Sequence, residues 1–303
     1  VGHCVEGLQL SSGGSYLYVQ SRLGNSSVYR YSVSSGDRES LNVGGWPTGM
    51  DVDQGTGELF VANHFNGTVD VFSGTTKMTT IDHGYKSSTH DLSTTTYDSP
   101  ANRLYVAVPE QGVVVAIDTS SRTVDHVLSG FPVADEDEEG ENASKYQLAV
   151  DTSRHELWVY TVDDDRLRVY DSSYDCLKSI DLSSKSFSGY TVNILRYVSG
   201  LGRVFVGPYA YNTSSKSYED KLGAGQVVVA YDSGYGYLIT ATADGGTLSI
   251  HAVDPDSLAS KGTKEITTYS FAPPVLEADT DDRKLYVGLQ VEAKVLKYGY
   301  SID

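Results

Sequence analysis

One short motif recurs seven times along the chain: an aliphatic residue, usually followed by an aromatic one, leads into a run typical of a β-strand. The copies lie 34 to 53 residues apart and extend through the 303 residues without a linker-like break. A unit of this length holds about four short strands and cannot bury both its faces alone, so neighbouring units must stack. The copies are Leu17-Tyr18-Val19, Leu59-Phe60-Val61, Leu104-Tyr105-Val106, Leu157-Trp158-Val159, Val204-Phe205-Val206, Leu238-Ile239-Thr240 and Leu285-Tyr286-Val287.

The second unit shows the pattern inside one repeat. Residues 45–53, 55–63 and 67–72 each alternate apolar and polar side chains, Gly, Asn or Asp separates them, and a fourth strand is expected near 77–81. Each unit is therefore an antiparallel four-stranded sheet. The chain is predicted to be all-β, a seven-bladed β-propeller forming a single domain over residues 1–303.

Two units depart from the repeat. The fifth has Tyr209, Tyr211, Tyr218 and a polar run where its third and fourth strands are expected, so it is incomplete or carries an ordered insertion. The seventh ends at Asp303 soon after its third strand. Its outer strand is missing, is supplied by residues 1–5, or is donated by a neighbouring molecule.

An aspartate precedes the repeated aliphatic residue by six positions in five of the seven units. This is where the first strand of a unit turns into the second. A carboxylate there can accept hydrogen bonds from backbone N–H groups one or two residues on and so close the turn. We expect a structural role for these residues, which are Asp53, Asp98, Asp151, Asp232 and Asp279.

The second and third units carry a family resemblance. Pro47-Thr48-Gly49 through Asp53, followed by Leu59-Phe60-Val61-Ala62-Asn63 and Gly67-Thr68-Val69-Asp70-Val71, resembles the repeat of YVTN-type propellers. That superfamily also contains lactonase-like propellers and archaeal surface-layer propeller domains. The resemblance implies seven blades, and it implies little about activity because the fold hosts enzymes, scaffolds and binding modules.

The first strands of the units also predict which side chains line the axis. Aligned positions place Asp51, Arg196 and Glu277 there, from three different blades. They either orient an anionic or hydroxylated ligand or form an ion-pair network that fills the channel. Near the same opening, His64 with His83 and His90 could converge on a ligand or metal, although no recognisable metal motif joins them.

An acidic loop partly resembles a calcium site. Asp135, Asp137 and Glu139 occupy alternate positions before Gly140, but Tyr146 stands where an EF-hand needs a bidentate Glu. The loop is either a weak calcium site or simply a solvated acidic segment. No other cofactor is indicated.

The overall charge limits the classes of partner. A net charge of −17 opposes nucleic-acid binding, which depends on Lys and Arg neutralising phosphates. No apolar stretch approaches the roughly 18 residues that span a bilayer, so we expect no membrane insertion. Partners are expected to be proteins or glycans, including other copies of the chain.

Several features favour a secreted or cell-surface protein. Four Asn-x-Ser/Thr sequons begin at Asn25, Asn66, Asn142 and Asn212. A start at Val1 without Met is what signal-peptide removal leaves, and a trimmed chain would look the same. Cys4 and Cys176 fall in distant units, so they are free or bond between molecules, head to tail.

No concentrated catalytic motif accompanies these features. The sequence has no Gly-x-Ser-x-Gly elbow, phosphate loop or dinucleotide fingerprint. The favoured function is an extracellular, non-enzymatic module for binding, adhesion or building a surface layer or filament. The alternative is a lactonase-like or lyase-like enzyme whose site lies at the axial opening.

Overall fold

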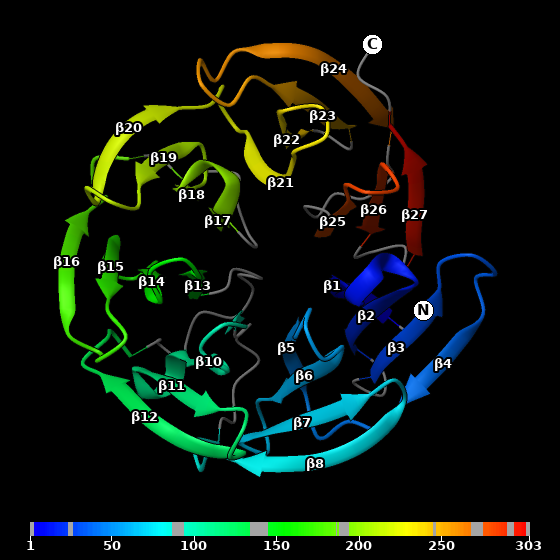
Figure 1. Cartoon of the computed structure of the whole chain (residues 1–303), viewed down its shortest axis with the longest axis vertical. Helices are drawn as coiled ribbons and strands as arrows, with labels where there is room; N and C mark the ends of the chain where they lie inside the picture. Colours follow the sequence, from blue (N-terminus) through cyan, green and yellow to red (C-terminus); the bar gives the residue numbers. More distant parts are fainter. Residues whose placement is uncertain are drawn as a thin grey trace.

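The chain folds into a ring of seven antiparallel sheets around a central axis, shown in Figure 1. This computed structural model describes residues 3–23, 27–86, 94–133, 145–185, 187, 194–244, 247–267, 275–289 and 294–300, without the side chains of residues 3, 4, 22, 23 and 267. Within those residues six sheets have four strands and one has three, always in sequence order from the axis outward. The predicted seven-bladed β-propeller is confirmed.

The strands of the first four blades are as follows. Blade 1 has β1 (His3–Leu10), β2 (Tyr16–Leu23), β3 (Ser27–Ser32) and β4 (Arg38–Leu41). Blade 2 has β5 (Pro47–Val52), β6 (Glu58–Asn63), β7 (Thr68–Ser73) and β8 (Thr76–Asp82). Blade 3 has β9 (Thr95–Asp98), β10 (Arg103–Val108), β11 (Val113–Asp118) and β12 (Thr123–Ser129). Blade 4 has β13 (Tyr146–Asp151), β14 (Glu156–Thr161), β15 (Arg166–Tyr170) and β16 (Cys176–Asp181).

The remaining blades close the circle. Blade 5 has β17 (Leu195–Val198), β18 (Arg203–Val206), β19 (Tyr209–Asn212) and β20 (Ser217–Lys221). Blade 6 has β21 (Val227–Asp232), β22 (Tyr237–Asp244), β23 (Thr247–Val253) and β24 (Ser260–Thr267). Blade 7 has β25 (Val275–Asp279), β26 (Lys284–Leu289) and β27 (Lys294–Gly299). Three short 3₁₀ turns are η1 (Ser12–Gly14), η2 (Pro109–Gln111) and η3 (Ser199–Leu201), and no described helix is long and apolar enough to cross a membrane.

The recurring motif is the second strand of each blade, and its alternation explains the ring. Successive side chains of a strand point to opposite faces of the sheet. In β10, Leu104 and Val106 pack in the cluster shared with blade 2, whereas Tyr105 packs in the cluster shared with blade 4. The other six second strands divide their apolar motif residues in the same way, so each of the seven hydrophobic clusters of the described residues joins two adjacent blades.

The turn aspartates behave as predicted in four blades. Their carboxylates accept backbone N–H groups two or three residues on, at 2.9 Å for Gly55 to Asp53 and at 3.0 Å for Ser153 to Asp151, Gly234 to Asp232 and Asp282 to Asp279. The fifth, Asp98, is different because its carboxylate contacts the ring of His155 in the next blade, 2.9 Å away. These turns and the turns between third and fourth strands define one side of the ring, the turn face. The other connections form the loop face.

The outer strands of five blades carry a feature that hinders pairing with other chains. In blades 2 to 6 the pairing of the third and fourth strands shifts register at one residue, as between Val71 and Phe72 or between Val169 and Tyr170. Such bulges bend and twist an edge strand, which hinders edge-to-edge association.

The fifth blade corrects one expectation. Its third and fourth strands are present but short, with Tyr211 opposite Tyr218 across the pair and their rings 5.9 Å apart. Tyrosine pairs therefore replace the aliphatic alternation that marks other blades. Because the sequence pattern was judged by aliphatic residues, these strands were missed.

The seventh blade has three strands among the described residues, and the beginning of the chain does not complete it. His3–Leu10 is instead the innermost strand of blade 1, paired with β2. The idea that residues 1–5 supply the outer strand of blade 7 is therefore wrong for the described residues 3–5. The ring closes by side-chain packing, with Val5, Leu8 and Val19 of blade 1 against Val275 and Tyr286 of blade 7.

Two phenylalanines of blade 2 give a matched test of this packing. Phe60 is fully buried between blades 2 and 3, whereas Phe65 is 54% exposed. We expect Phe60→Ala to lower the free energy of unfolding by about 3–5 kcal/mol, since a cavity remains at the blade interface. Phe65→Ala should change it by less than about 0.5 kcal/mol. Urea denaturation of both variants checks this, and equal losses would contradict the interface model.

Candidate functional site

A cavity of about 410 Å³ lies on the axis of the ring. It is lined by residues of β1, β5, β9, β13, β17 and β25, the innermost strands of six blades. Each of these strands pairs with only one neighbour in its sheet, so its other backbone edge faces the axis. Unpaired N–H and C=O groups on such an edge need partners or water.

The three axial residues chosen from the sequence all line this cavity. The nearest Arg196 nitrogen lies 3.7 Å from Glu277 Oε2, which makes a loose ion pair. Asp51 accepts hydrogen bonds from the N–H groups of Val52 and Tyr97, both at 2.8 Å. The structure therefore brings Asp51, Arg196 and Glu277 into one cavity, and their role in binding a ligand stays a prediction.

These side chains also belong to a series of bonds that joins blade to blade. In six of the seven blade-to-blade steps around the axis, a polar side chain reaches the backbone of the next inner strand or of the residue adjoining it. The bonds are Gln20 to Pro47 O (2.8 Å), Tyr97 N to Asp51 (2.8 Å), Leu148 N to Thr94 (3.1 Å), Ile194 N to Gln147 (2.7 Å), Arg196 to Val229 O (2.7 Å) and Leu10 N to Glu277 (3.4 Å). Each of these bonds satisfies one backbone group at or beside the open edge of an inner strand. We call these six bonds the axial stitches.

Burial controls the protonation of the two axial acids. It raises the pKa of Asp51 from 3.8 to about 7, against the opposing effect of the two backbone N–H groups and of Arg196. Burial also raises the pKa of Glu277, although Arg196 and the Leu10 N–H favour its charged form. Asp51 is therefore protonated in part of the population at neutral pH.

The cavity wall retains some free hydrogen-bonding capacity. Thr48 and Thr95 both line it, and their hydroxyl oxygens have no hydrogen-bond partner among the described residues. With the partly exposed Arg196 guanidinium, these hydroxyls could contact a small polar ligand.

Neither of the two described histidines of this group, His64 and His83, lines the axial cavity. His64 contacts Glu110 in the loop-face connection of blade 3, and both side chains are almost fully buried. His83 is buried nearby, and burial lowers its pKa to about 4. His90 lies outside the described residues. His64 therefore belongs to the interface of blades 2 and 3 and not to the axial cavity.

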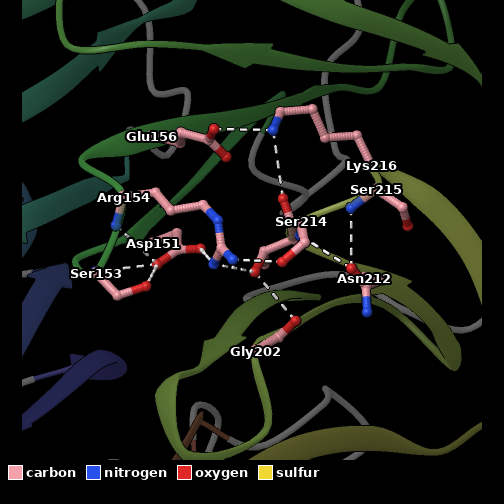
Figure 2. Close-up of polar contacts among 10 residues, drawn as sticks. Asp151, Ser153, Arg154, Glu156, Gly202, Asn212, Ser214, Ser215 and Lys216 are labelled. Atoms are coloured by element: carbon pink, nitrogen blue, oxygen red, sulfur yellow. Dashed lines mark hydrogen bonds and ion pairs between the residues drawn. The ribbon is translucent and has the colours of Figure 1, made fainter.

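The turn face carries a second set of bonds between blades, and Figure 2 shows the set between blades 4 and 5. Arg154 lies 3.1 Å from Asp151 of its own blade and donates to Thr213 of the next blade at 3.1 Å. Lys216 pairs with Glu156 across the same interface at 2.8 Å. Equivalent links elsewhere are Ser99 to Asp53 (3.0 Å), His155 to Asp98 (2.9 Å) and Tyr300 to Asp232 (3.2 Å). This network connects neighbouring blades.

The remaining sequence candidates are scattered over the molecule. Asn66 is exposed on the loop face, whereas Asn212 ends β19 on the turn face and accepts the N–H groups of Ser214 and Ser215. Cys176 is an exposed free thiol at the start of β16, and Cys4 lies in β1 without a described side chain. Asn25, Asn142, Asp135, Asp137 and Glu139 lie outside the described residues. Elsewhere in the described chain, no three His, Cys, Asp or Glu side chains are grouped to hold a metal.

Sequence reasoning missed an aromatic pair on the loop face. Phe65 is 54% exposed, and its ring centroid lies 5.6 Å from that of Trp46. Trp46 has a φ of 51°, a left-handed conformation that is rare for a bulky residue and strained. Hydrogen bonds from His64 N to Trp46 O (2.9 Å) and from Gly45 N to Asn66 (2.9 Å) hold this loop. The Trp-Pro dipeptide beside a repeat boundary was the available signal.

Comparisons with known proteins support the fold and go no further. No family model matches the chain, and no curated protein does. A chain of a mitotic checkpoint complex superposes with a TM-score of 0.72 at 14% identity, covering 98% of this chain and 87% of that one. Hydrazine synthase of Kuenenia stuttgartiensis gives 0.70 at 13% identity, covering 100% and 98%. These are two of 1066 matching chains, so the fold alone selects no function.

The raised pKa of Asp51 predicts a pH dependence of stability. Its folded pKa of about 7 exceeds the ordinary 3.8, so its contribution to stability is present below about pH 4 and is lost as pH rises toward 7. Relative to Asp51→Asn, we expect the wild type to lose about 1–3 kcal/mol between pH 4.5 and 7.5. Urea denaturation at both pH values measures this.

Asp53 is the control, because it lies two residues away with its pKa shifted in the opposite direction. Partial burial raises that pKa, but hydrogen bonds from Thr56, Gly55 and Ser99 outweigh burial and lower it. Its stabilising contribution is therefore lost as pH falls below about 4. Identical pH profiles for wild type and Asp51→Asn would show that Asp51 keeps an ordinary pKa.

Proposed function

We propose that the protein is a non-enzymatic propeller of the YVTN-like kind that binds a protein partner on its loop face, outside the cell. The exposed Phe65 beside the strained Trp46 is the observation that carries the proposal. Large aromatic side chains contribute much of the binding energy of protein interfaces. A rigid aromatic anchor supported by a loop suits recognition of another surface.

The axial stitches support a binding module in preference to an enzyme. A lactonase-like or lyase-like mechanism would draw on Asp51, Arg196 and Glu277, yet all three side chains form bonds with backbone groups of the next blade. Removing any of them from that task would expose an unsatisfied strand edge. Their chemistry is accounted for by assembly of the ring.

An extracellular location is proposed from the sequons. Asn66 directly follows Phe65 and is exposed, so a glycan there would stand beside the aromatic pair and restrict access to it. Adhesion and assembly into a surface layer or filament are uses of the same binding capacity, and a bond between Cys4 and Cys176 of neighbouring molecules would reinforce them. A glycan at Asn66 would regulate such contacts.

Selection from a random peptide library displayed on phage tests the binding face. Peptides enriched on the wild type should bind Phe65→Ala at least about tenfold more weakly, because truncating an aromatic anchor typically removes 1.4 kcal/mol or more. Met78→Ala is the matched control, since Met78 is 57% exposed on the outer strand of the same blade. Peptides that lose affinity only for Met78→Ala, or that bind all three proteins equally, would refute the proposed face.

Intact-mass analysis of native material tests the extracellular assignment. Treatment with an N-glycosidase should lower the mass by one or more whole glycans, and Asn66→Gln should remove one glycan without unfolding the protein, because Asn66 is exposed. Enzymatic removal of that glycan from the wild type, which leaves an oxygen acceptor at position 66 for the Gly45 N–H, should also increase peptide binding at Phe65. A mass unchanged by glycosidase would argue against secretion, while leaving the peptide selection as an independent test of the binding face.

A further inference from the structure

Among the described residues, the edge of the seventh blade is formed by its third strand, where the other blades have a fourth strand. Six sheets have an outer fourth strand, whereas β27 is the outermost described strand of blade 7. Every other blade also buries an aliphatic residue at or next to the loop-face end of its outer strand. These residues are Leu41, Ile81, Leu128, Leu182, Leu222 and Ile266. Blade 7 has no such residue among those described.

The lack of this residue is visible in the exposure of the strand beneath it. In blades 1 to 4 and 6, this aliphatic side chain lies opposite or beside a residue of the third strand that is only 0–1% exposed. These third-strand residues are Val28, Val69, Val114, Leu167 and Leu248. The equivalent residue of blade 7 is Val295, the second residue of β27, and it is only half-buried. A shallow apolar step is therefore left uncovered beside β27.

The backbone phase of β27 shows which groups face outward. Tyr300 lies opposite Arg283 in the register of β26 and β27, and its N–H donates to Arg283 O at 3.1 Å. Every second residue before Tyr300, namely 298, 296 and 294, therefore also directs its backbone hydrogen bonds toward β26. In an antiparallel pair these alternate with residues whose N–H and C=O point away. Val295, Lys297 and Gly299 therefore direct their backbone groups to the open side, which is the arrangement that accepts an added strand.

Charge indicates what kind of strand fits. Lys294 and Lys297 are both exposed on β27, in a protein whose net charge is −17. Lys297 also donates to Val33 O at 3.0 Å, and the nearby Asp282 is paired with Lys284. Since Val295 and Lys297 share one face of the strand, a partner strand needs an aliphatic residue opposite Val295 and an acidic residue opposite Lys297.

We propose that β27 binds an extended, acidic segment of another polypeptide as the fourth strand of blade 7. The segment pairs antiparallel with β27 through Val295, Lys297 and Gly299, and its aliphatic side chain covers Val295. An Asp or Glu two residues earlier faces Lys297. This edge lies on the outer rim of the ring in Figure 1 and is independent of the aromatic pair on the loop face.

A peptide copied from β8 serves as the probe. In blade 2, Ile81 lies opposite Val69 and Thr79 lies opposite Val71, and these two third-strand positions correspond to Val295 and Lys297 of blade 7. The peptide therefore keeps Ile81 and carries Thr79→Glu to place an acid opposite Lys297. It also carries Lys77→Thr, which removes its own positive charge. We expect saturable binding by fluorescence anisotropy and slower hydrogen exchange at the outward amides of β27. A control peptide that also carries Ile81→Asp should bind at least about tenfold more weakly, and high salt should weaken binding of the acidic peptide.

Two protein variants separate edge pairing from other modes of binding. Val295→Pro removes an outward N–H but none of the bonds to β26, so it should reduce affinity at least about tenfold. Lys297→Glu leaves the backbone intact and should also weaken binding, whereas Lys178→Glu on the complete fourth blade should not. If Val295→Pro failed to fold, the Lys297 and Lys178 pair would still decide the question.

The proposal fails if the peptide does not bind the wild type, or if it binds Val295→Pro and Lys297→Glu as tightly as the wild type. Unchanged exchange at residues 295, 297 and 299 in the presence of bound peptide would also overturn it. If the wild-type chain self-associates and Val295→Pro abolishes that self-association, the partner strand comes from a second copy of this chain. The proposal of a different polypeptide as the partner would then be wrong.

Discussion

The second strand of each blade is packed between two interfaces, and the ring depends on this double burial. Its aliphatic residues face the preceding blade and its aromatic residue, or Ile239 in blade 6, faces the following one. No blade can bury both faces alone, so the hydrophobic energy is realised only when neighbours are present. Closure between blades 7 and 1 obeys the same rule, which explains how a ring closes without sharing a strand.

Hydrogen bonds and ion pairs hold neighbouring blades together at the axis and on the turn face, where few apolar side chains meet. At the axis, side chains such as Gln147 and Asp51 accept backbone N–H groups at the inner edge of the next blade. On the turn face, carboxylates that close a turn also hold the next blade, as Asp53 does through Ser99. These acids therefore have a structural role, and the binding sites proposed for this protein lie elsewhere, on the loop face and at the edge of β27.

Much of the architecture could be predicted because it is periodic. The Leu-aromatic-Val spacing predicted seven blades, and the position of aspartate six residues earlier predicted turns that four of the five carboxylates close. Tyrosine-rich strands such as β19 were not predicted because their alternation is aromatic and not aliphatic. The position of His3–Leu10 was not predicted because the sequence of a terminal strand is the same whether the strand is the inner or the outer one of a blade.

The sequence by itself determined the repeat, the all-β class and the presence of Asp51, Arg196 and Glu277 near the axis, since strand alternation is a local property of the chain. Only the tertiary structure decided what those side chains do. Their partners, such as Tyr97 N and Val229 O, come from the next blade, tens of residues away, and pairing at that distance is set by how blades pack. The strained Trp46 beside the exposed Phe65 is likewise visible only in three dimensions, because it is defined by backbone geometry and exposure. For blade 7, the sequence left open what supplies an outer strand, and the structure decided that the described residues 3–5 do not, because they pair with β2 in blade 1.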